Sequence, residues 1–307
     1  MKIKEAQTWA IKKLRESQIE QPEISASLLL AEILSVAKSY LMLNPDQLLT
    51  DNQEKKYRSW VLRRMKHEPV WYITKHVEFC DQDFVVNKNV LIPRPETEIL
   101  IELILNQVKN KKLKIKSPMQ ILDVGTGSGA IILTLAKQFG DYSSNDSEKF
   151  STNNSSHSSS NNKYYASDIS DKALQIAKKN ADNFNYRTKI LFKKGNLFEP
   201  WENKKFDYVI ANLPYVPSDK MSELSLDILN FEPKIALDGG KNGLEIYQTF
   251  LSQATDHLNK NGRIYCEIGD KQGPNMTKMA KQFFPKSQVE VIKDYGGFDR
   301  VISIQNS

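Results

Sequence analysis

The sequence predicts an α/β protein in which a small helical domain and a hairpin linker precede a doubly wound parallel sheet. Three observations support this prediction. Apolar residues recur at helical spacing through residues 1–66. Short apolar runs then alternate with amphipathic helical segments from residue 97 onward. Between these regions, apolar residues flank a polar turn, and the prolines that follow stop a helix.

Residues 1–75 are predicted to form the helical domain. Pro22 suits the first turn of a helix, where the missing N–H group of proline is not needed. Asp51 and Glu54 resemble a capping box at the start of another helix, and basic residues near the end of that helix are favourable for its dipole. We therefore expect a bundle of short helices.

Residues 76–96 are predicted to form the hairpin linker. Apolar side chains lie on both sides of a polar turn, and they are Val77, Phe79, Phe84 and Val86. This arrangement is typical of two short antiparallel strands. Pro93 and Pro95 follow and prevent the segment from continuing as a helix.

The sheet domain is predicted to span residues 97–307 and to begin with a helix that ends near Lys109. Its predicted strands are short apolar runs at residues 119–125, 164–169, 189–194, 206–212, 263–268 and 298–304. Helical segments, such as residues 129–139 and 172–184, separate them. Strands joined through helices run parallel, and the helices cover both faces of the sheet.

One segment interrupts this alternation. Residues 141–162 contain nine Ser and five Asn among 22 residues, where a short helix-to-strand turn is expected. Such a polar segment cannot bury enough surface to pack, so we expect a flexible surface insertion. Tolerated padding is the favoured interpretation over a regulatory role, because long surface loops add little to the entropy of loop closure.

The composition excludes several classes of protein and of site. The chain has 307 residues, 40% of them hydrophobic, and two cysteines, which excludes a disordered chain, a collagen and a disulfide scaffold. Its net charge of +6 is too slight to indicate a partner.

The cysteines and histidines indicate neither a metal site nor an oxidising location. Cys80 and Cys266 are far apart and the four histidines lack metal-binding spacing, so we expect no metal site and a reducing, cytoplasmic location. No uncharged apolar run approaches the roughly 18–20 residues of a membrane span, so we expect neither export nor a membrane anchor.

The strongest local motif is the run Asp123-Val-Gly-Thr-Gly-Ser-Gly129, which lies between a buried strand and an apolar helix. Glycines allow a sharp turn and the close approach of a ligand, and the N-terminus of the helix offers free N–H groups to an anionic part of that ligand. The motif alone does not separate a methyl donor from a dinucleotide, because Gly125, Gly127 and Ala130 also fit the pattern G-x-G-x-x-A.

Asp168 ends the second predicted strand of the sheet domain. A carboxylate at this edge of the sheet can accept hydrogen bonds from the two ribose hydroxyls of an adenosine ligand. NAD and S-adenosylmethionine (SAM) both contain such a ribose. Asp168 could instead be a charge at the N-terminus of the next helix, but the glycine motif before it favours the ligand role.

The run Asn212-Leu-Pro-Tyr215 ends a buried strand at the edge of the same crevice and favours SAM. Methyl transfer to a planar NH₂ group needs acceptors that hold both N–H groups, direct the nitrogen lone pair and stabilise the growing positive charge. The Asn212 side-chain oxygen and the Leu213 carbonyl could be these acceptors, since Leu213 precedes a proline and is biased toward extended backbone. Tyr215 offers an aromatic face to the flat group. Alone, the run would be interpreted as an Asn-x-Pro turn.

These residues resemble a known family, the SAM-dependent enzymes that methylate the side-chain amide nitrogen (N5) of glutamine in peptide chain release factors. The similarity extends from about Arg63 to Ile304. Its most specific strings are Ile92-Pro-Arg-Pro-Glu-Thr-Glu98 and Glu232-Pro-Lys-Ile-Ala-Leu-Asp-Gly-Gly240. Shorter strings are Glu68–Ile73, Gly195–Pro200, Gly243–Tyr247 and Glu267–Gly269.

The resemblance implies a helical N-terminal domain that docks the release factor, and a seven-stranded, Rossmann-like catalytic sheet that binds SAM. It implies that the cofactor is held by Asp123, Gly125, Thr126, Gly127, Ser128, Gly129, Asp168, Asn196, Leu197 and Asn212. It further implies that the glutamine amide of a Gly-Gly-Gln loop is held by the catalytic residues Asn212, Leu213, Pro214 and Tyr215. On this interpretation no nucleic acid is required.

Two positions depart from the family pattern. The family usually has proline in place of Leu213 and aspartate in place of Asn196. Leucine keeps the backbone carbonyl but loses the fixed φ of proline, and an asparagine oxygen accepts a hydrogen bond more weakly than a carboxylate. We expect both changes to slow the enzyme without abolishing its activity.

Three other functions fit parts of the sequence. Asn-Leu-Pro-Tyr also resembles the motif of ribosomal RNA adenine dimethyltransferases, although those enzymes generally place a helical domain after the sheet. This chain has no arginine-rich tract interleaved with aromatic residues to grip RNA. Leu213 and Asn196 would also suit a catalytically weak module that only binds release factors. An NAD oxidoreductase ranks last, because no acid or base pair near the crevice suggests hydride transfer.

Overall fold

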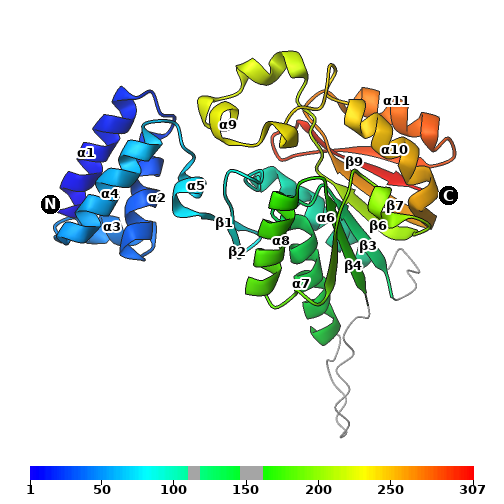
Figure 1. The fold of residues 1–307 in the computed structure, drawn as a ribbon, viewed down its shortest axis with the longest axis horizontal. Helices are drawn as coiled ribbons and strands as arrows, with labels where there is room; N and C mark the ends of the chain where they lie inside the picture. Colours follow the sequence, from blue (N-terminus) through cyan, green and yellow to red (C-terminus); the bar gives the residue numbers. More distant parts are fainter. Residues whose placement is uncertain (110–117, 146–161) are drawn as a thin grey trace, which may run out of the picture. The chain divides into compact units, whose positions relative to one another are not determined.

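The computed structural model describes residues 1–109, 118–145 and 162–307 (Figure 1). The chain forms two compact units. The first, here called the helical unit, consists of Met1–His76, Val86–Lys88 and Glu223–Glu232. The second, here called the sheet unit, consists of Val77–Val85, Asn89–Ser222 and Pro233–Ser307. The chain therefore enters the helical unit again long after it has left the N-terminal region.

The helical unit is built on short helices around a buried apolar core. Its N-terminal helices are α1 (Ile3–Glu16), α2 (Pro22–Leu34), α3 (Lys38–Leu43), α4 (Asp51–Arg64) and α5 (Val70–Thr74). Pro22 occupies the first turn of α2, as predicted. The capping box at the start of α4 is formed by Thr50 and Gln53, one residue earlier than the predicted pair Asp51 and Glu54. The core includes Ile3, Leu14, Leu29, Tyr57 and Val61. The packing of apolar faces, more than helix propensity, stabilises helices of this length.

A later segment of the chain completes the helical unit. Helix α9 (Leu226–Phe231) carries Asp227, whose Oδ2 lies 2.7 Å from Nη2 of Arg64. The other oxygen of Asp227 lies 3.1 Å from Nδ1 of His67. Arg64 is almost fully buried, so its charge needs a partner of this kind.

Strands β1 (His76–Phe79) and β2 (Gln82–Val85) form a two-stranded hairpin. Cys80 and Asp81 make the turn, and both have positive φ, as the tight turns that match strand twist require. Asn180 fixes the second strand from a distant helix, because its side chain accepts a hydrogen bond from the Val85 N–H at 2.8 Å and donates one to the Val85 carbonyl at 3.0 Å.

The sheet unit contains a seven-stranded sheet with the order β5-β4-β3-β6-β7-β9-β8. The strands are β3 (Gln120–Val124), β4 (Lys163–Asp168), β5 (Ile190–Lys194), β6 (Phe206–Ala211), β7 (Leu258–Glu267), β8 (Gln288–Lys293) and β9 (Asp299–Gln305). Neighbouring strands from β5 to β7 pair in parallel, which confirms the predicted doubly wound sheet. The parallel direction predicted for the last strand is wrong. Strand β9 is antiparallel to both of its neighbours, because a short turn joins β8 directly to β9.

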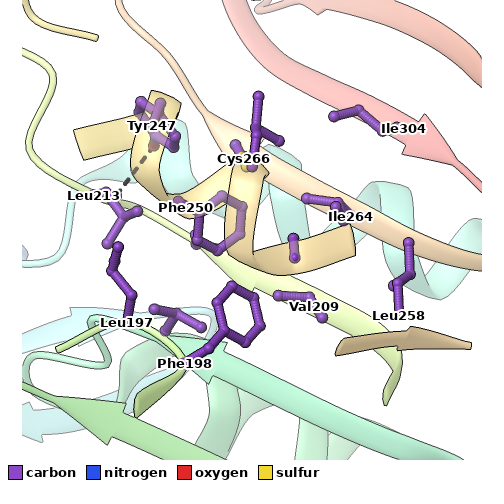
Figure 2. Close-up of a cluster of buried hydrophobic side chains, with 14 of the residues drawn as sticks. Leu197, Phe198, Val209, Leu213, Tyr247, Phe250, Leu258, Ile264, Cys266 and Ile304 are labelled. Atoms are coloured by element: carbon purple, nitrogen blue, oxygen red, sulfur yellow. Dashed lines mark hydrogen bonds between the residues drawn. The ribbon is translucent and has the colours of Figure 1, made fainter. Parts of the chain in front are cut away.

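Helices lie on both faces of this sheet (Figure 1). They are α6 (Glu98–Lys109), α7 (Ala130–Asn145), α8 (Asp171–Asn183), α10 (Glu245–His257) and α11 (Gly273–Phe283). Short 3₁₀ turns are η1 (Pro95–Thr97), η2 (Glu199–Trp201), η3 (Ser218–Glu223) and η4 (Lys234–Ala236). Side chains of α10 such as Phe250 pack on one face in a cluster with Val209, Ile264 and Ile304 (Figure 2). Met276 and Ala280 of α11 belong to the same cluster. Helices α7 and α8 pack against β3, β4 and β5.

Part of the predicted Ser/Asn insertion lies outside the described residues. Of residues 141–162, the first five belong to the end of α7, and residues 146–161 are not described. Among the residues that the structure does describe, no helix is both long and apolar enough to cross a bilayer.

Candidate active site

A cavity opens at the carboxyl ends of strands β3 to β6, within the sheet unit. The strand order reverses at β3, since β4 and β5 follow on one side and β6 and β7 on the other. Open α/β sheets bind ligands at such a point. The cavity encloses about 1150 Å³, counting the space open to solvent. Its lining comes mainly from the loops after these four strands. Other lining residues are Asn89, Val90, Leu91, Pro93, Thr97, Pro233, Ile235 and Ala236.

Three glycines shape the loop between β3 and α7, and all three have positive φ: Gly125, Gly127 and Gly129. A Cβ atom on Gly125 would lie 2.9 Å from Cδ2 of Leu213, in the loop after β6. A Cβ atom on Gly129 would lie 3.3 Å from Cβ of Ala177, where α7 and α8 pack closely. Gly127 is different, because nothing lies within 4 Å of such an atom. Its backbone therefore borders open space in the cavity wall.

Two carboxylates flank this loop. Asp123 is fully buried, and its Oδ2 accepts a hydrogen bond from Oγ1 of Thr126 at 2.7 Å. Within the described residues, its Oδ1 has no hydrogen-bond partner. Burial raises the pKa of Asp123 to about 7. Asp168 accepts hydrogen bonds from the backbone N–H groups of Gly127 at 2.9 Å and Ser170 at 2.8 Å. Burial raises the pKa of Asp168, and these two N–H groups act in the opposite direction.

The loop after β5 brings Asn196 and Leu197 to the same cavity. Leu197 is buried with φ of +50°, and its carbonyl accepts a hydrogen bond from Oγ of Ser167 at 3.3 Å. The N–H group of Gly195 donates to the Asp168 carbonyl at 3.1 Å. The ends of β4 and β5 are thereby joined, so Asp168 and Leu197 are held in a fixed relation.

The loop Asn212–Tyr215 is held from behind by other elements. The Leu213 N–H group donates to the Tyr247 hydroxyl at 3.1 Å, and the Leu213 side chain lies in the buried cluster of α10 (Figure 2). Nε2 of Gln272 donates to the Tyr215 carbonyl at 2.9 Å. A Cβ atom on Gly239 would lie only 2.7 Å from the Pro214 carbonyl oxygen, so the loop that contains Gly239 packs closely against this backbone.

Glu267, the last residue of β7, lies beside this loop and is almost fully buried. Its Oε1 accepts a hydrogen bond from the Tyr215 hydroxyl at 3.1 Å, and its Oε2 accepts one from Oγ1 of Thr97 at 2.6 Å. Nδ2 of Asn212 donates to the same Thr97 oxygen at 3.3 Å. Burial raises the pKa of Glu267, while the hydroxyls of Thr97 and Tyr215 lower it. Burial also holds the pKa of Tyr215 above its ordinary value, so its hydroxyl remains a donor.

The structure brings most of the predicted site residues together. Those that line the cavity are Gly125, Thr126, Gly127, Ser128, Asp168, Asn196, Leu197, Asn212, Leu213 and Pro214. Asp123, Gly129 and Tyr215 lie behind this lining, bonded to or packed against it. The chemical roles of all these residues remain predictions.

Sequence reasoning gave no role to Thr97 or Glu267. Both lie in strings that carry the family resemblance, yet 170 residues separate them and no local pattern connects them. One signal could have pointed to Glu267. It ends a buried strand, as Asp168 does, and parallel strands bring such residues to the same edge of a sheet.

Comparisons with known proteins follow the division seen in the structure. A model described as "PrmC N-terminal domain" matches residues 5–74, and one described as "Methyltransferase domain" matches residues 115–297. A release factor glutamine methyltransferase of Bacillus cereus is 32% identical over 304 residues, covering 98% of each chain. The chain belongs to the release factor glutamine methyltransferase family. The family, enzyme class and fold predicted from the sequence are thus confirmed.

Two further comparisons agree with this assignment. A bifunctional methyltransferase of Rickettsia conorii is 32% identical over 319 residues, and the match covers 98% of this chain but only 57% of that longer protein. A crystal structure of a methyltransferase from Pyrococcus furiosus aligns with a TM-score of 0.50 at 18% identity. That alignment covers 81% of this chain and 98% of the other, and it supports the fold alone.

Proposed function

We propose that this member of the release factor glutamine methyltransferase family transfers a methyl group from SAM to a glutamine side-chain amide nitrogen (N5). The glutamine is that of the Gly-Gly-Gln loop of peptide chain release factors. One observation carries the proposal, namely that Asn212 and Leu213 line the same cavity as the glycine loop and Asp168. Acceptors for an NH₂ group and a site for an adenosine ligand are thereby adjacent.

The residues at the cavity fit SAM, which supplies an electrophilic methyl group when bound. Asp168 Oδ1 and Oδ2 each accept one backbone N–H group and keep a lone pair for a ribose hydroxyl. Gly127 leaves space for close approach. Asn196 and Leu197 border the place expected for adenine. Asp123 lies behind this lining, and its Oδ2 accepts a hydrogen bond from the Thr126 hydroxyl.

The acceptor amide is proposed to be held by Asn212 and Leu213. Oδ1 of Asn212 and the Leu213 carbonyl oxygen accept the two N–H groups of the glutamine and turn its nitrogen lone pair toward the methyl group. They also stabilise the positive charge that grows on this nitrogen. No strong base is needed, since the nitrogen loses its proton after the transfer. Tyr215, which lies behind the lining, is proposed to support this arrangement through its hydrogen bond to Glu267.

The helical unit is proposed to dock the release factor, and the reaction is proposed to take place in the cytoplasm without nucleic acid. This division of roles is supported by the separate match of residues 5–74 to an N-terminal domain model. No observation favours a second function over this one.

A methylation assay tests the proposal. The protein and SAM are incubated with an intact release factor, with a variant whose Gly-Gly-Gln glutamine is alanine, and separately with ribosomal RNA. We expect a mass gain of one methyl group on the intact factor alone, and no gain with Asn212→Ala. Transfer to RNA would support the adenine methyltransferase alternative. Donor binding without any transfer would support the binding module.

A further inference from the structure

A chain of three side chains leads from the buried end of β7 to the cavity. Oε2 of Glu267 accepts a hydrogen bond from Oγ1 of Thr97 at 2.6 Å. Oγ1 of Thr97 in turn accepts a hydrogen bond from Nδ2 of Asn212 at 3.3 Å. Thr97 and Asn212 both line the cavity, whereas Glu267 lies behind them and is 1% exposed. All three belong to the sheet unit.

The direction of these hydrogen bonds follows from the chemistry of the groups. Both oxygens of Glu267 accept hydrogen bonds from hydroxyl groups, those of Thr97 and Tyr215, as the oxygens of an ionised carboxylate do. Thr97 has a single hydroxyl proton, which is used on Glu267. Its oxygen can therefore only accept from Asn212, and the group of Asn212 that faces it must be the NH₂ group.

We propose that Glu267 and Thr97 are positioning residues that fix which end of the Asn212 amide faces the substrate. This inference rests on the function proposed above. With Nδ2 held by Thr97, Oδ1 is left for the glutamine NH₂ group. A flipped Asn212 amide would place its NH₂ group against the NH₂ group of the glutamine, so that two donors would face each other. The acceptor for the growing positive charge would then be lost.

Packing alone cannot impose this choice. The oxygen and the NH₂ group of an amide have nearly the same size, so the two orientations fill the same space. A partner that can only accept distinguishes them, and a buried carboxylate behind a hydroxyl makes such a partner. The rival explanation is that Thr97 merely ties η1 to β7 and stabilises the fold.

Two substitutions of Thr97 separate these explanations. Thr97→Val removes the hydroxyl with little change of shape, and Thr97→Ser keeps it. With full-length protein, SAM and an intact release factor, we expect Thr97→Val to lower kcat about tenfold. This is the scale of one hydrogen bond, that between Asn212 Oδ1 and the glutamine NH₂ group, which a flipped amide would lose. The affinity for SAM, measured by calorimetry, should change much less than kcat, since Asp168 and the glycine loop are unaltered. Thr97→Ser should restore most of kcat.

A wild-type kcat in Thr97→Val would overturn the inference, and so would a lower melting temperature with kcat unchanged, because that result fits a tether alone. If the wild-type protein itself methylates no release factor, the proposed function fails instead.

Side-chain NMR tests the inference even if the wild-type protein methylates no release factor. The Nδ2 signals of Asn212, identified by their loss in Asn212→Ala, should shift and exchange faster with solvent in Thr97→Val but not in Thr97→Ser. Unchanged Nδ2 signals in Thr97→Val would refute it.

Discussion

Two glycines of the loop after β3 are close in sequence but differ in what surrounds them. Both have positive φ, which side chains adopt at a cost. Gly129 faces the packed junction of α7 and α8, where an added Cβ would meet Leu133 at 2.9 Å. Gly127 faces open space at the cavity. Gly129 therefore permits close packing of the two helices, and Gly127 leaves room for a ligand.

We expect Gly127→Ala to weaken SAM binding more than it weakens the fold. The backbone strain should lower the free energy of unfolding by about 1 kcal/mol, while the methyl group enters the cavity wall. Gly129→Ala is the matched control, and it should lower stability by more than Gly127→Ala because the methyl group has no room. Calorimetry with SAM and urea denaturation measure the two effects. Equal SAM affinity in wild type and Gly127→Ala would contradict this assignment.

The Asp123 carboxyl makes stability depend on pH. Its pKa is about 7 in the fold, whereas an aspartate in the unfolded chain titrates near 4. Between these values the unfolded chain releases its proton first, so the free energy of unfolding falls as pH rises from about 4 to 7. The carboxyl therefore favours the folded state at acid pH and opposes it at neutral pH.

Asp123→Asn removes this titration. We expect the melting temperature of the variant, relative to that of the wild type, to rise between pH 5 and pH 8. Melting curves without SAM at several pH values check this prediction. A constant difference across that range would show that burial does not perturb Asp123.

Among the elements, the loop after β6 depends on α10 for its position. The Tyr247 hydroxyl accepts from the Leu213 N–H group and donates to the Glu267 carbonyl. A proline at position 213, usual in the family, would have no N–H group to donate. The Leu213 side chain instead adds to the buried cluster around Phe250 (Figure 2). The departure from the family pattern thus has a local structural counterpart.

We expect Tyr247→Phe to lower both stability and kcat. The Leu213 N–H group would be buried without an acceptor, which costs roughly 1–3 kcal/mol, and the loop that holds Asn212 would be less fixed. Tyr57→Phe is the matched control, because its buried hydroxyl donates to the Ala26 carbonyl at 3.0 Å within the helical unit. It should lower stability without changing kcat. Urea denaturation and the methylation assay compare the two variants, and equal kcat values would contradict the expected role of Tyr247.

Sequence periodicity predicted most strands but could not predict all of them. Strands β3 and β6 are nearly continuous apolar runs because both of their faces are covered, and such runs are easy to recognise. Strand β8 alternates charged and apolar residues at an edge of the sheet, and it was not predicted. The antiparallel direction of β9 follows from its short connection to β8, so missing one strand also hid the reversal of the other.

Motifs within one loop predicted much of the candidate site, because the residues after each parallel strand meet at one edge. The contacts that connect Thr97, Asn212 and Glu267 join segments far apart in the chain. Only folding reveals these contacts, since no spacing in the sequence encodes them.

At the scale of the whole molecule, the segment Glu223–Glu232 belongs to the helical unit, although the residues before and after it belong to the sheet unit. Within this segment, Asp227 forms an ion pair with the buried Arg64. Arg64 also donates to the Ser25 hydroxyl and the Glu68 carbonyl, so it would keep some partners without Asp227. Sequence reasoning placed a domain boundary near residue 75 and did not anticipate this return of the chain.

We expect Asp227→Asn to destabilise the helical unit by roughly 2 kcal/mol, less than for a fully buried pair because Asp227 is partly exposed. The segment 223–232 should also be cut faster in limited proteolysis, since its anchor is weakened. Asp219→Asn makes the same charge change at an exposed position and should do neither. Equal cleavage rates in the two variants would show that the ion pair does not hold this segment.

The return of the chain through Glu223–Glu232 also bears on how such a molecule can be taken apart. No single cut separates the helical unit from the sheet unit, because each is assembled from segments that alternate along the chain. A chimaera that exchanges the helical unit with that of a relative must transplant the inner segment as well as the N-terminal one. Joining two genes end to end would not produce this arrangement.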